Sequence, residues 1–359
     1  MTVSKPLDND LREEVIDDYR NDEPSPVRYE ISTYGADYDV EGLVKRLRRG
    51  DILIPSFQRN YVWKQAEASR FIESLLLGLP VPSVFLAKES ESNKLLVIDG
   101  QQRLKTLQFF FDGYFNNKPF KLAKVQEEFE GASYDSLSEP DRIKLNDSII
   151  HAIIVKQESP DNDNTSIYHI FDRLNSEGRR LTSQEIRTAV DHGDLIDLVK
   201  QLNEYPSWRK IYGKQSDRLK DQELILRFLA FYFELTRYEK PLEEFINKFS
   251  RKNRRPDPAF LKKAEEVFKR SIDIIFGSIG QSAFRPKRAI NAAVFDSVMV
   301  SVARLSDSSS ELNLGKLNLL YQKLISDDVY IDLIIGSTSD ERNVRERFEK
   351  TWNVLGNPE

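Results

Sequence analysis

The segment from Leu95 to Leu104, LLVIDGQQRL, constrains the fold of this chain most strongly. Its apolar run stops abruptly at Asp99 and Gly100, and polar side chains follow. A helical pattern then begins, with apolar residues on one face at Leu104, Leu107, Phe110 and Phe111. We therefore expect a strand, a tight turn and a helix in direct succession.

The predicted turn carries the elements of a phosphate site. Gly100 can adopt backbone angles that other residues avoid, and it places no Cβ between the turn and a ligand. The first backbone N–H groups of the following helix have no partner within the helix and carry partial positive charge. Arg103 adds a planar, permanently charged guanidinium one turn into the helix. The alternative is an ordinary strand-to-helix corner with a surface arginine.

The composition excludes several classes of site and of protein. The 359 residues include no cysteine, which excludes disulfides, cysteine-based zinc sites and Fe–S clusters. The N-terminus is polar and acidic, and the longest apolar segment, Leu224–Leu235, is too short to span a bilayer. We therefore expect a cytoplasmic protein without a membrane partner. The formal net charge of -5 requires any nucleic-acid binding to come from a local basic patch.

The chain divides by pattern into three parts. Residues 1–30 are acidic and read as a flexible, mostly solvated lead-in. Residues 31–190 mix helical and strand patterns, and residues 191–359 show helical periods with almost no strand signal. The fold class is thus α+β followed by an α-helical domain.

The sequence patterns also predict individual elements. In the first domain we expect helices at 40–47, 65–77, 165–175 and after the capping box at Thr182. We expect strands there at 51–55, 84–88 and 94–98, and a buried strand at 149–155. In the second we expect helices at 219–235, 258–276, 289–305 and 342–352.

Three motifs in order resemble a known family. They are QRNYVW at 58–63, VIDGQQRL at 97–104, and FDRLN at 171–175 followed by LTSQE at 181–185. Together they are similar to the N-terminal domain of GmrSD-type restriction endonucleases, whose wider relatives are the ParB and sulfiredoxin nucleotide-binding domains. The resemblance covers about residues 40 to 190, and it implies a ParB/sulfiredoxin-like domain followed by helices.

The resemblance implies a nucleoside triphosphate bound with Mg²⁺ and hydrolysed in connection with action on DNA. The core motif supplies Asp99, Gly100, Gln101, Gln102 and Arg103. The other motif positions, implied to bind the nucleotide, are Gln58, Arg59, Tyr61, Trp63 and Asn175. The chain departs from the family at Gly178-Arg179-Arg180, where relatives often keep smaller residues, and this leaves the geometry of that loop open.

Each motif residue has a physical role with an alternative. Arg103 and Arg59 would neutralise phosphate oxygens, and Gln101 or Gln102 would orient the attacking water. Asp99 is either a Mg²⁺ ligand or the cap of the following helix. Tyr61 and Trp63 stack on a base or pack in the core. Asn175 either contacts the nucleotide or caps a helix end.

Histidines argue against a nuclease site in this chain. The three histidines, His151, His169 and His192, lack the spacing of a metal site, and His151 is expected in the core. Relatives often carry an HNH nuclease domain, whose chemistry needs a histidine base together with Asn and His ligands, and no histidine follows His192. We therefore expect that DNA is cut by a separately encoded nuclease.

A basic stretch in the second domain is the candidate DNA-binding surface. It consists of Lys248, Arg251, Lys252, Arg254 and Arg255, and a second cluster lies at 285–288. Such side chains contact the phosphate backbone without sequence specificity, or else they cover a solvated loop.

The resulting hypothesis is an NTP-binding and NTP-hydrolysing component of a DNA-restriction or antiphage system. The alternative is a non-enzymatic, nucleotide-gated DNA-binding regulator. A standalone nuclease is a third hypothesis, for which the sequence offers only scattered carboxylates.

Overall fold

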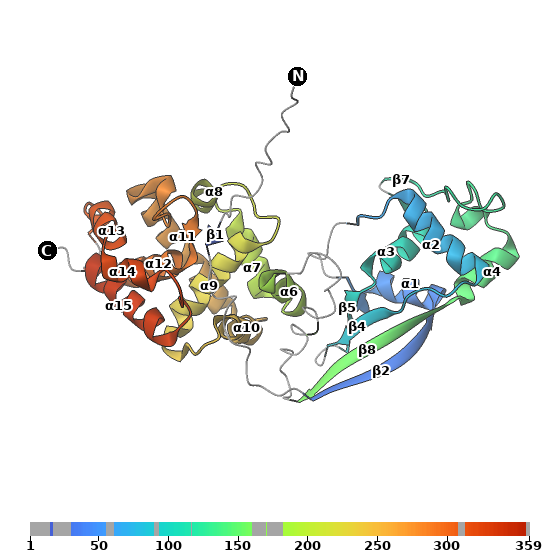
Figure 1. Cartoon of the computed structure of the whole chain (residues 1–359), viewed down its shortest axis with the longest axis horizontal. Coiled ribbons are helices and arrows are strands. Elements are labelled where there is room, and N and C mark those ends of the chain that lie inside the picture. Colours follow the sequence, from blue (N-terminus) through green and yellow to red (C-terminus); the bar gives the residue numbers. More distant parts are fainter. Residues whose placement is uncertain are drawn as a thin grey trace, which may run out of the picture. The chain divides into compact units, whose positions relative to one another are not determined.

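The chain forms two compact units (Figure 1). The structure, a computed structural model, describes residues 15–16, 30–54, 61–89, 93–115, 117–159, 170, 182–307 and 313–356. One unit comprises residues 27–181 and 188–190, and we call it the sheet unit. The other comprises residues 1–26, 182–187 and 191–359, and we call it the helical unit.

A mixed five-stranded sheet is the centre of the sheet unit. Its strand order is β2 (Glu30–Asp39), β8 (Ile149–Ser159), β4 (Val84–Lys88), β5 (Leu95–Asp99) and β3 (Ile52–Leu53). Strands β2 and β8 pair antiparallel, β4 runs parallel to β8, and β5 pairs antiparallel with β4 and parallel with β3. The predicted hairpin of 84–88 and 94–98 is confirmed as β4 and β5.

Helices cover one face of this sheet. They are α1 (Val40–Arg49), α2 (Gln65–Leu77), α3 (Gln101–Asp112) and α4 (Glu139–Asp147). Strand residues such as Leu86, Val97 and Ile154 enter one core with helix residues such as Leu43 and Leu107. Helix α2 begins and ends where the sequence pattern predicts. Its end is at Gly78, which adopts a left-handed φ of 72°. Smaller elements complete the unit: β6 (Tyr114–Phe115), β7 (Lys118–Pro119) and the 3₁₀ turn η2 (Tyr134–Ser136).

Strand β8 corrects one prediction. The sequence predicts a buried strand at 149–155, but the strand extends to Ser159 and several of its residues are exposed. His151 lies on the exposed side, with Nδ1 2.6 Å from Oδ1 of Asp37 on β2, and the expectation of a core histidine is wrong. The run resembles a fully buried strand because its outer face is apolar as well: Ile149 is 47% exposed.

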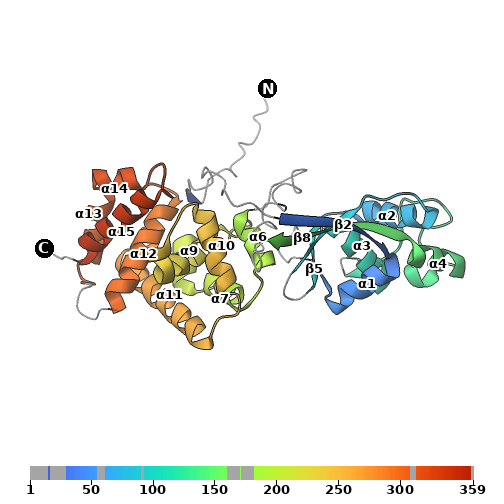
Figure 2. The same ribbon diagram turned by 90° about the horizontal axis from the view of Figure 1, so that it is seen from below.

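The helical unit packs helices around α9 and α12 (Figures 1 and 2). Its helices are α7 (Asp194–Asn203), α8 (Pro206–Tyr212), α9 (Lys220–Glu234), α10 (Leu242–Lys252), α11 (Pro258–Ser278), α12 (Ala292–Asp307), α13 (Leu317–Ile325), α14 (Asp328–Leu333) and α15 (Glu341–Gly356). Helix α6 (Ser183–Val190) begins in the helical unit, and its last three residues, 188–190, belong to the sheet unit. The 3₁₀ turn η3 (Leu235–Arg237) follows α9, and the 3₁₀ turn η4 (Gly280–Ser282) follows α11. The four predicted helices correspond to α9, α11, α12 and α15, and the capping box at Thr182 begins α6.

A short strand joins the N-terminal segment to the helical unit. Strand β1 (Val15–Ile16) pairs parallel with β9 (Ile290–Asn291), and Val15 is buried in the core of the helical unit. The burial of Val15 is therefore an exception to the solvated lead-in expected for residues 1–30. The sequence feature that could have indicated this burial is an apolar Val-Ile pair within an acidic segment.

The fold class predicted from the sequence is confirmed as a mixed α/β region followed by helices. The predicted helix at 165–175 lies outside the described residues, apart from residue 170. Within the described ranges, each helix is too short or too polar to cross a membrane.

Candidate nucleotide site

The turn between β5 and α3 requires glycine. Gly100 has φ 100° and ψ 9°, and it is the N-cap residue of α3. A Cβ at this position would lie 2.5 Å from Cγ1 of Val84, the first residue of β4. Because glycine has no side chain to cap the helix, no side-chain hydrogen bond from Gly100 closes the N-terminus of α3. The turn is thus narrow, tightly packed against β4, and uncapped.

Arg103 lies in the first turn of α3, with its side chain 15% exposed. Its Nη2 donates to the carbonyl oxygen of Ser83 at 3.1 Å and to Oδ2 of Asp99 at 2.9 Å. Its Nε is buried and has no hydrogen-bond partner among the described residues. Since an unsatisfied buried N–H is costly, this donor is suited to a ligand or a water molecule. The guanidinium is therefore fixed at Nη2 and unsatisfied at Nε.

Asp99 ends β5 and its side chain is 51% exposed. The N-cap position of α3 belongs to Gly100, and the Asp99 carboxylate pairs with Arg103 instead, so the capping alternative does not describe this structure. Within the described residues, no three His, Asp or Glu side chains gather as a metal site. A single exposed carboxylate still fits Mg²⁺ bound to a nucleotide, because phosphates and water supply most ligands of that ion.

The two glutamines of the core motif have different surroundings. Oε1 of Gln102 accepts hydrogen bonds from the backbone N–H groups of Val62, at 3.0 Å, and Trp63, at 3.3 Å. Its amide oxygen therefore fixes the segment before α2, and its Nε2 is the group left to contact a water molecule. Gln101 is buried, with an exposed fraction of 8%.

The two aromatic residues of the upstream motif pack into the core. The Tyr61 ring makes edge contacts with Phe109 and Phe115, with centroid distances of 5.0 and 5.5 Å. Its hydroxyl lies 2.7 Å from Oγ1 of Thr106, and burial raises the pKa of Tyr61 to about 12. The Trp63 ring lies edge-on to Phe71, at 5.8 Å. These contacts favour core packing over base stacking, since both rings already contact other aromatic rings.

Comparison with known proteins identifies the domain that contains this turn. Residues 40–190 match the family model of the GmrSD restriction endonuclease N-terminal domain. The chain carries this domain. The family resemblance predicted from the three motifs is therefore confirmed.

A curated relative of this chain is an uncharacterized protein of Methanocaldococcus jannaschii. It is 31% identical over 102 residues, a match that covers 22% of this chain and 17% of the relative. The chain thus matches less than a fifth of that relative's length.

Some predicted site residues of the GmrSD-type domain lie outside the described residues. They are Gln58, Arg59 and Asn175. The residues that the structure does bring together are Asp99, Gly100 and Arg103, with Gln102 binding the backbone beside Tyr61. The proximity of Ser83 to Arg103 has no counterpart in the sequence prediction, because a backbone carbonyl leaves no sequence signal.

The predicted basic stretch lies in α10 and just after it, and part of its charge is already paired. Nζ of Lys252 lies 2.5 Å from Oε1 of Glu234, and Nζ of Lys248 lies 3.9 Å from Oε2 of Glu244. Nε of Arg254 donates to the carbonyl of His192 at 2.8 Å. Arg255 is exposed.

The second basic cluster includes a structural arginine. Arg285 donates to the carbonyl oxygens of Ile211, Tyr212 and Gln281. It therefore fixes backbone in the helical unit, and burial lowers its pKa from the usual value. Lys287 and Arg288 beside it are exposed.

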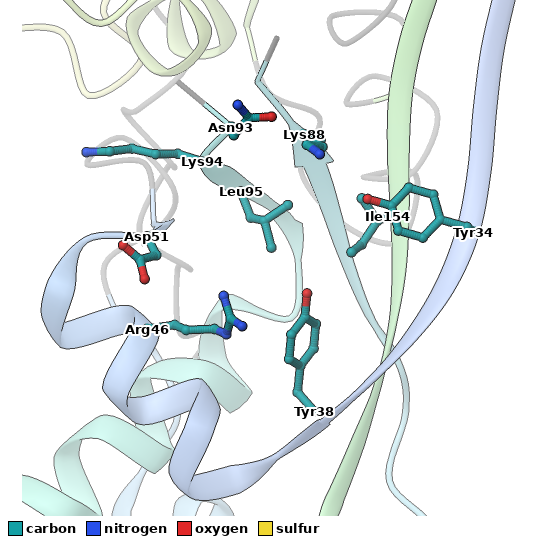
Figure 3. Close-up of a pocket in the computed structure, with 9 residues that line it drawn as sticks. All are labelled: Tyr34, Tyr38, Arg46, Asp51, Lys88, Asn93, Lys94, Leu95 and Ile154. Carbon is teal, nitrogen blue, oxygen red and sulfur yellow. The ribbon is translucent and has the colours of Figure 1, made fainter. Parts of the chain in front are cut away.

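A pocket at the other end of the sheet has no counterpart in the sequence prediction (Figure 3). Its walls include Tyr34 and Tyr38 of β2, Arg46 of α1 and Lys88 of β4. The sequence signal is a pair of tyrosines four residues apart, which a strand places on one face. The sequence pattern does not predict strand β2 itself. Without the structure, the spacing of the two tyrosines therefore does not show that they share a face.

Proposed function

We propose that the GmrSD-type domain binds a nucleoside triphosphate at the turn between β5 and α3 and hydrolyses it within a restriction or defence system that acts on DNA. The match of residues 40–190 to a restriction endonuclease domain supports the biological role. The observation that carries the chemistry is the guanidinium of Arg103, whose buried Nε has no partner among the described residues beside the uncapped N-terminus of α3.

The geometry suits a polyphosphate for two physical reasons. An uncapped helix N-terminus presents backbone N–H groups and a positive dipole end to an anion. The bond from Arg103 Nη2 to the carbonyl of Ser83 orients the guanidinium while its Nε remains unsatisfied among the described residues. Phosphoryl transfer depends mostly on such positioning and charge stabilisation.

The neighbouring residues complete the proposed mechanism. Asp99 would hold Mg²⁺ on the phosphates through its exposed carboxylate, and Arg59 would add a second positive charge. Gln102 would orient the attacking water through Nε2, since Oε1 is bound by the backbone of Val62 and Trp63. Further proposed contacts of the nucleotide are Gln58, Gln101 and Asn175.

The test is equilibrium binding of ATP, GTP, CTP and UTP with Mg²⁺, together with a phosphate-release assay. We expect Arg103→Ala to weaken binding of the preferred nucleotide by about tenfold or more, since a charge-assisted hydrogen bond to phosphate is lost. Lys105→Ala is the matched control, because Lys105 carries the same charge two residues further along α3. The proposal fails if the wild-type protein binds none of the four nucleotides, or if Arg103→Ala binds as the wild type does.

One observation favours the second candidate function, a nucleotide-gated DNA-binding regulator without turnover. The oxygen of Gln102, which could otherwise accept a hydrogen bond from the attacking water, is occupied by two backbone N–H groups. Tight NTP binding without phosphate release, accompanied by a change in DNA affinity, would establish this function in place of hydrolysis.

DNA contact is proposed for the exposed residues of the basic stretch, Lys248, Lys252 and Arg255, with Arg251 and Arg254 nearby. The DNA affinity should fall as salt rises, because phosphate contacts release counterions. The cutting step is assigned to a separately encoded nuclease. A plasmid-cleavage assay of this chain alone, with Mg²⁺ and NTP, checks that assignment, and cleavage by the purified chain would overturn it.

A further inference from the structure

A pocket of about 310 Å³ in the sheet unit is lined by residues of strands β2, β4, β5 and β8 and of helix α1 (Figure 3). Leu95, which lines the pocket, begins β5, whereas Asp99 and the turn lie at the end of that strand. The two places are therefore at opposite ends of β5. A ligand in this pocket would not contact Arg103.

The charge of the pocket is positive. Arg46 and Lys88 line it, and neither makes a salt bridge to a residue in the described ranges. Asp51 also lines it, but its Oδ2 lies 2.6 Å from Nη2 of Arg49. Glu158, which lies near Lys88, is bound by Nζ of Lys156 at 2.5 Å and by Oγ of Ser32 at 2.7 Å. The nearby carboxylates are thus already paired, and the two cations remain available to an anion.

Two tyrosine rings lie beside these cations. Tyr34 and Tyr38 point from the same face of β2, and Tyr34 is 44% exposed. Arg46 lies over the Tyr38 ring, with Cζ 5.3 Å from the ring centroid. Within the described residues, neither ring packs against another aromatic ring, in contrast to Tyr61. Aromatic faces next to cationic side chains are the combination that binds the bases and phosphates of nucleotides.

We propose that this pocket is a second nucleotide site, which binds one nucleoside monophosphate unit. Arg46 and Lys88 bind the phosphate, and the faces of Tyr34 and Tyr38 contact the base. The volume lies at the lower end of the range of small-ligand pockets, which suits a single nucleotide. The unit is either a free nucleotide or one nucleotide of a single-stranded DNA, and both present the same chemistry.

The test measures binding of two probes by calorimetry, dAMP and a 12-nucleotide single-stranded oligo(dA). We expect Arg46→Ala to weaken binding of at least one probe by about tenfold or more, since its phosphate contact is charge-assisted. Lys45→Ala is the matched control: Lys45 neighbours Arg46 on α1, but it is exposed and pairs with Glu41 at 2.9 Å outside the pocket. It should bind both probes as the wild type does.

Two further variants separate this site from the Gly100 turn and from unfolding. Arg103→Ala should leave unchanged the affinity for the probe whose binding Arg46→Ala weakens. This result distinguishes failure of this proposal from failure of the proposed triphosphate site. Lys88→Ala provides a second test of the same pocket if thermal unfolding shows that Arg46→Ala is not folded.

The outcomes are decisive in both directions. Arg46-dependent binding of dAMP identifies a free-nucleotide site, and Arg46-dependent binding of the oligonucleotide alone identifies a site for a DNA strand. The proposal is overturned if neither probe binds, if Lys45→Ala weakens binding as much as Arg46→Ala, or if binding depends on Arg103 rather than on Arg46 and Lys88.

Discussion

The side-chain oxygen of Gln102 accepts a hydrogen bond from the backbone N–H of Val62 at 3.0 Å. Gln102 belongs to the core motif and Val62 to the upstream motif, so this bond joins two motifs that lie 40 residues apart in the sequence. The bond to the N–H of Trp63 strengthens the same junction. The spacing of the two motifs therefore has a structural meaning: the first turn of α3 holds the backbone that leads into α2.

Two substitutions at Gln102 separate its structural role from a catalytic one. Gln102→Ala removes both backbone hydrogen bonds and should lower the free energy of unfolding by about 1–2 kcal/mol, measured in urea. Gln102→Glu keeps an acceptor oxygen and should be closer to the wild type in stability, but it loses Nε2. If Nε2 orients water, Gln102→Glu binds NTP and releases little phosphate. A Gln102→Ala protein as stable as the wild type would contradict the structural role.

Gly100 should not tolerate a side chain. Gly100→Ala places a Cβ 2.5 Å from Cγ1 of Val84 at a φ of 100°, so both strain and overlap oppose it. The control is Gly113→Ala at the other end of α3, where φ is 76° and no heavy atom of the described residues lies within 4 Å. Gly113→Ala should cost about 1–2 kcal/mol for the left-handed conformation alone, and Gly100→Ala about 1–3 kcal/mol more for the overlap. Equal unfolding midpoints of the two variants would show that β4 yields to the added methyl group.

Asp99→Asn tests whether the carboxylate serves Mg²⁺ or only Arg103. The substitution removes the negative charge 2.9 Å from Nη2 of Arg103, so NTP affinity in EDTA should stay equal or rise. The gain in affinity on adding Mg²⁺ should become smaller, because a carboxylate ligand is lost. Asp112→Asn serves as the control. Asp112 lies on α3, as Arg103 does, and the substitution breaks only a surface pair with Arg48. An unchanged Mg²⁺ dependence in Asp99→Asn would exclude Asp99 as a metal ligand.

The stability of the sheet unit should decrease at high pH because of Tyr61. Burial raises the pKa of Tyr61 to about 12, above the value of 10.0 for an exposed tyrosine. The contribution of the neutral Tyr61 side chain to the free energy of unfolding is therefore complete below pH 10. It is lost as pH rises towards 12, because Tyr61 ionises at a lower pH in the unfolded state than in the folded state. In urea unfolding between about pH 8 and pH 11, Tyr61→Phe should show a weaker decline than the wild type. Tyr114→Phe should keep the wild-type slope, because Tyr114 is 62% exposed.

The buried ion pair of the helical unit should be sensitive to removal of one partner. Nη2 of Arg227 on α9 lies 2.5 Å from Oδ2 of Asp296 on α12, and both side chains are almost fully buried. Asp296→Ala leaves the guanidinium buried without this carboxylate and should cost about 3–5 kcal/mol in the free energy of unfolding. Asp197→Ala breaks an exposed pair with Lys200 and should cost less than about 1 kcal/mol. Similar losses in both variants would contradict the dominant role of burial.

Local features of the fold are predictable because they depend on neighbours in the sequence. Gly78 ends α2, Thr182 caps α6, and Gly100 separates β5 from α3, as the residue types alone indicate. Strand β2 escapes such prediction because its pattern is mostly exposed and its stability comes from β8, a strand far along the chain. The burial of Val15 escapes it for the same reason, since Val15 pairs with Ile290 of β9.

The sequence by itself determined the turn of the candidate site, its family, and the identities of Asp99, Gly100, Gln102 and Arg103. Only the tertiary structure decided what these side chains contact: Ser83 and Asp99 for Arg103, and the backbone of Val62 and Trp63 for Gln102. It also brought Tyr34, Arg46 and Lys88 to one pocket. The reason is physical: backbone angles and helix capping follow from adjacent residues, whereas hydrogen bonds and pockets between distant segments depend on how the sheet pairs its strands.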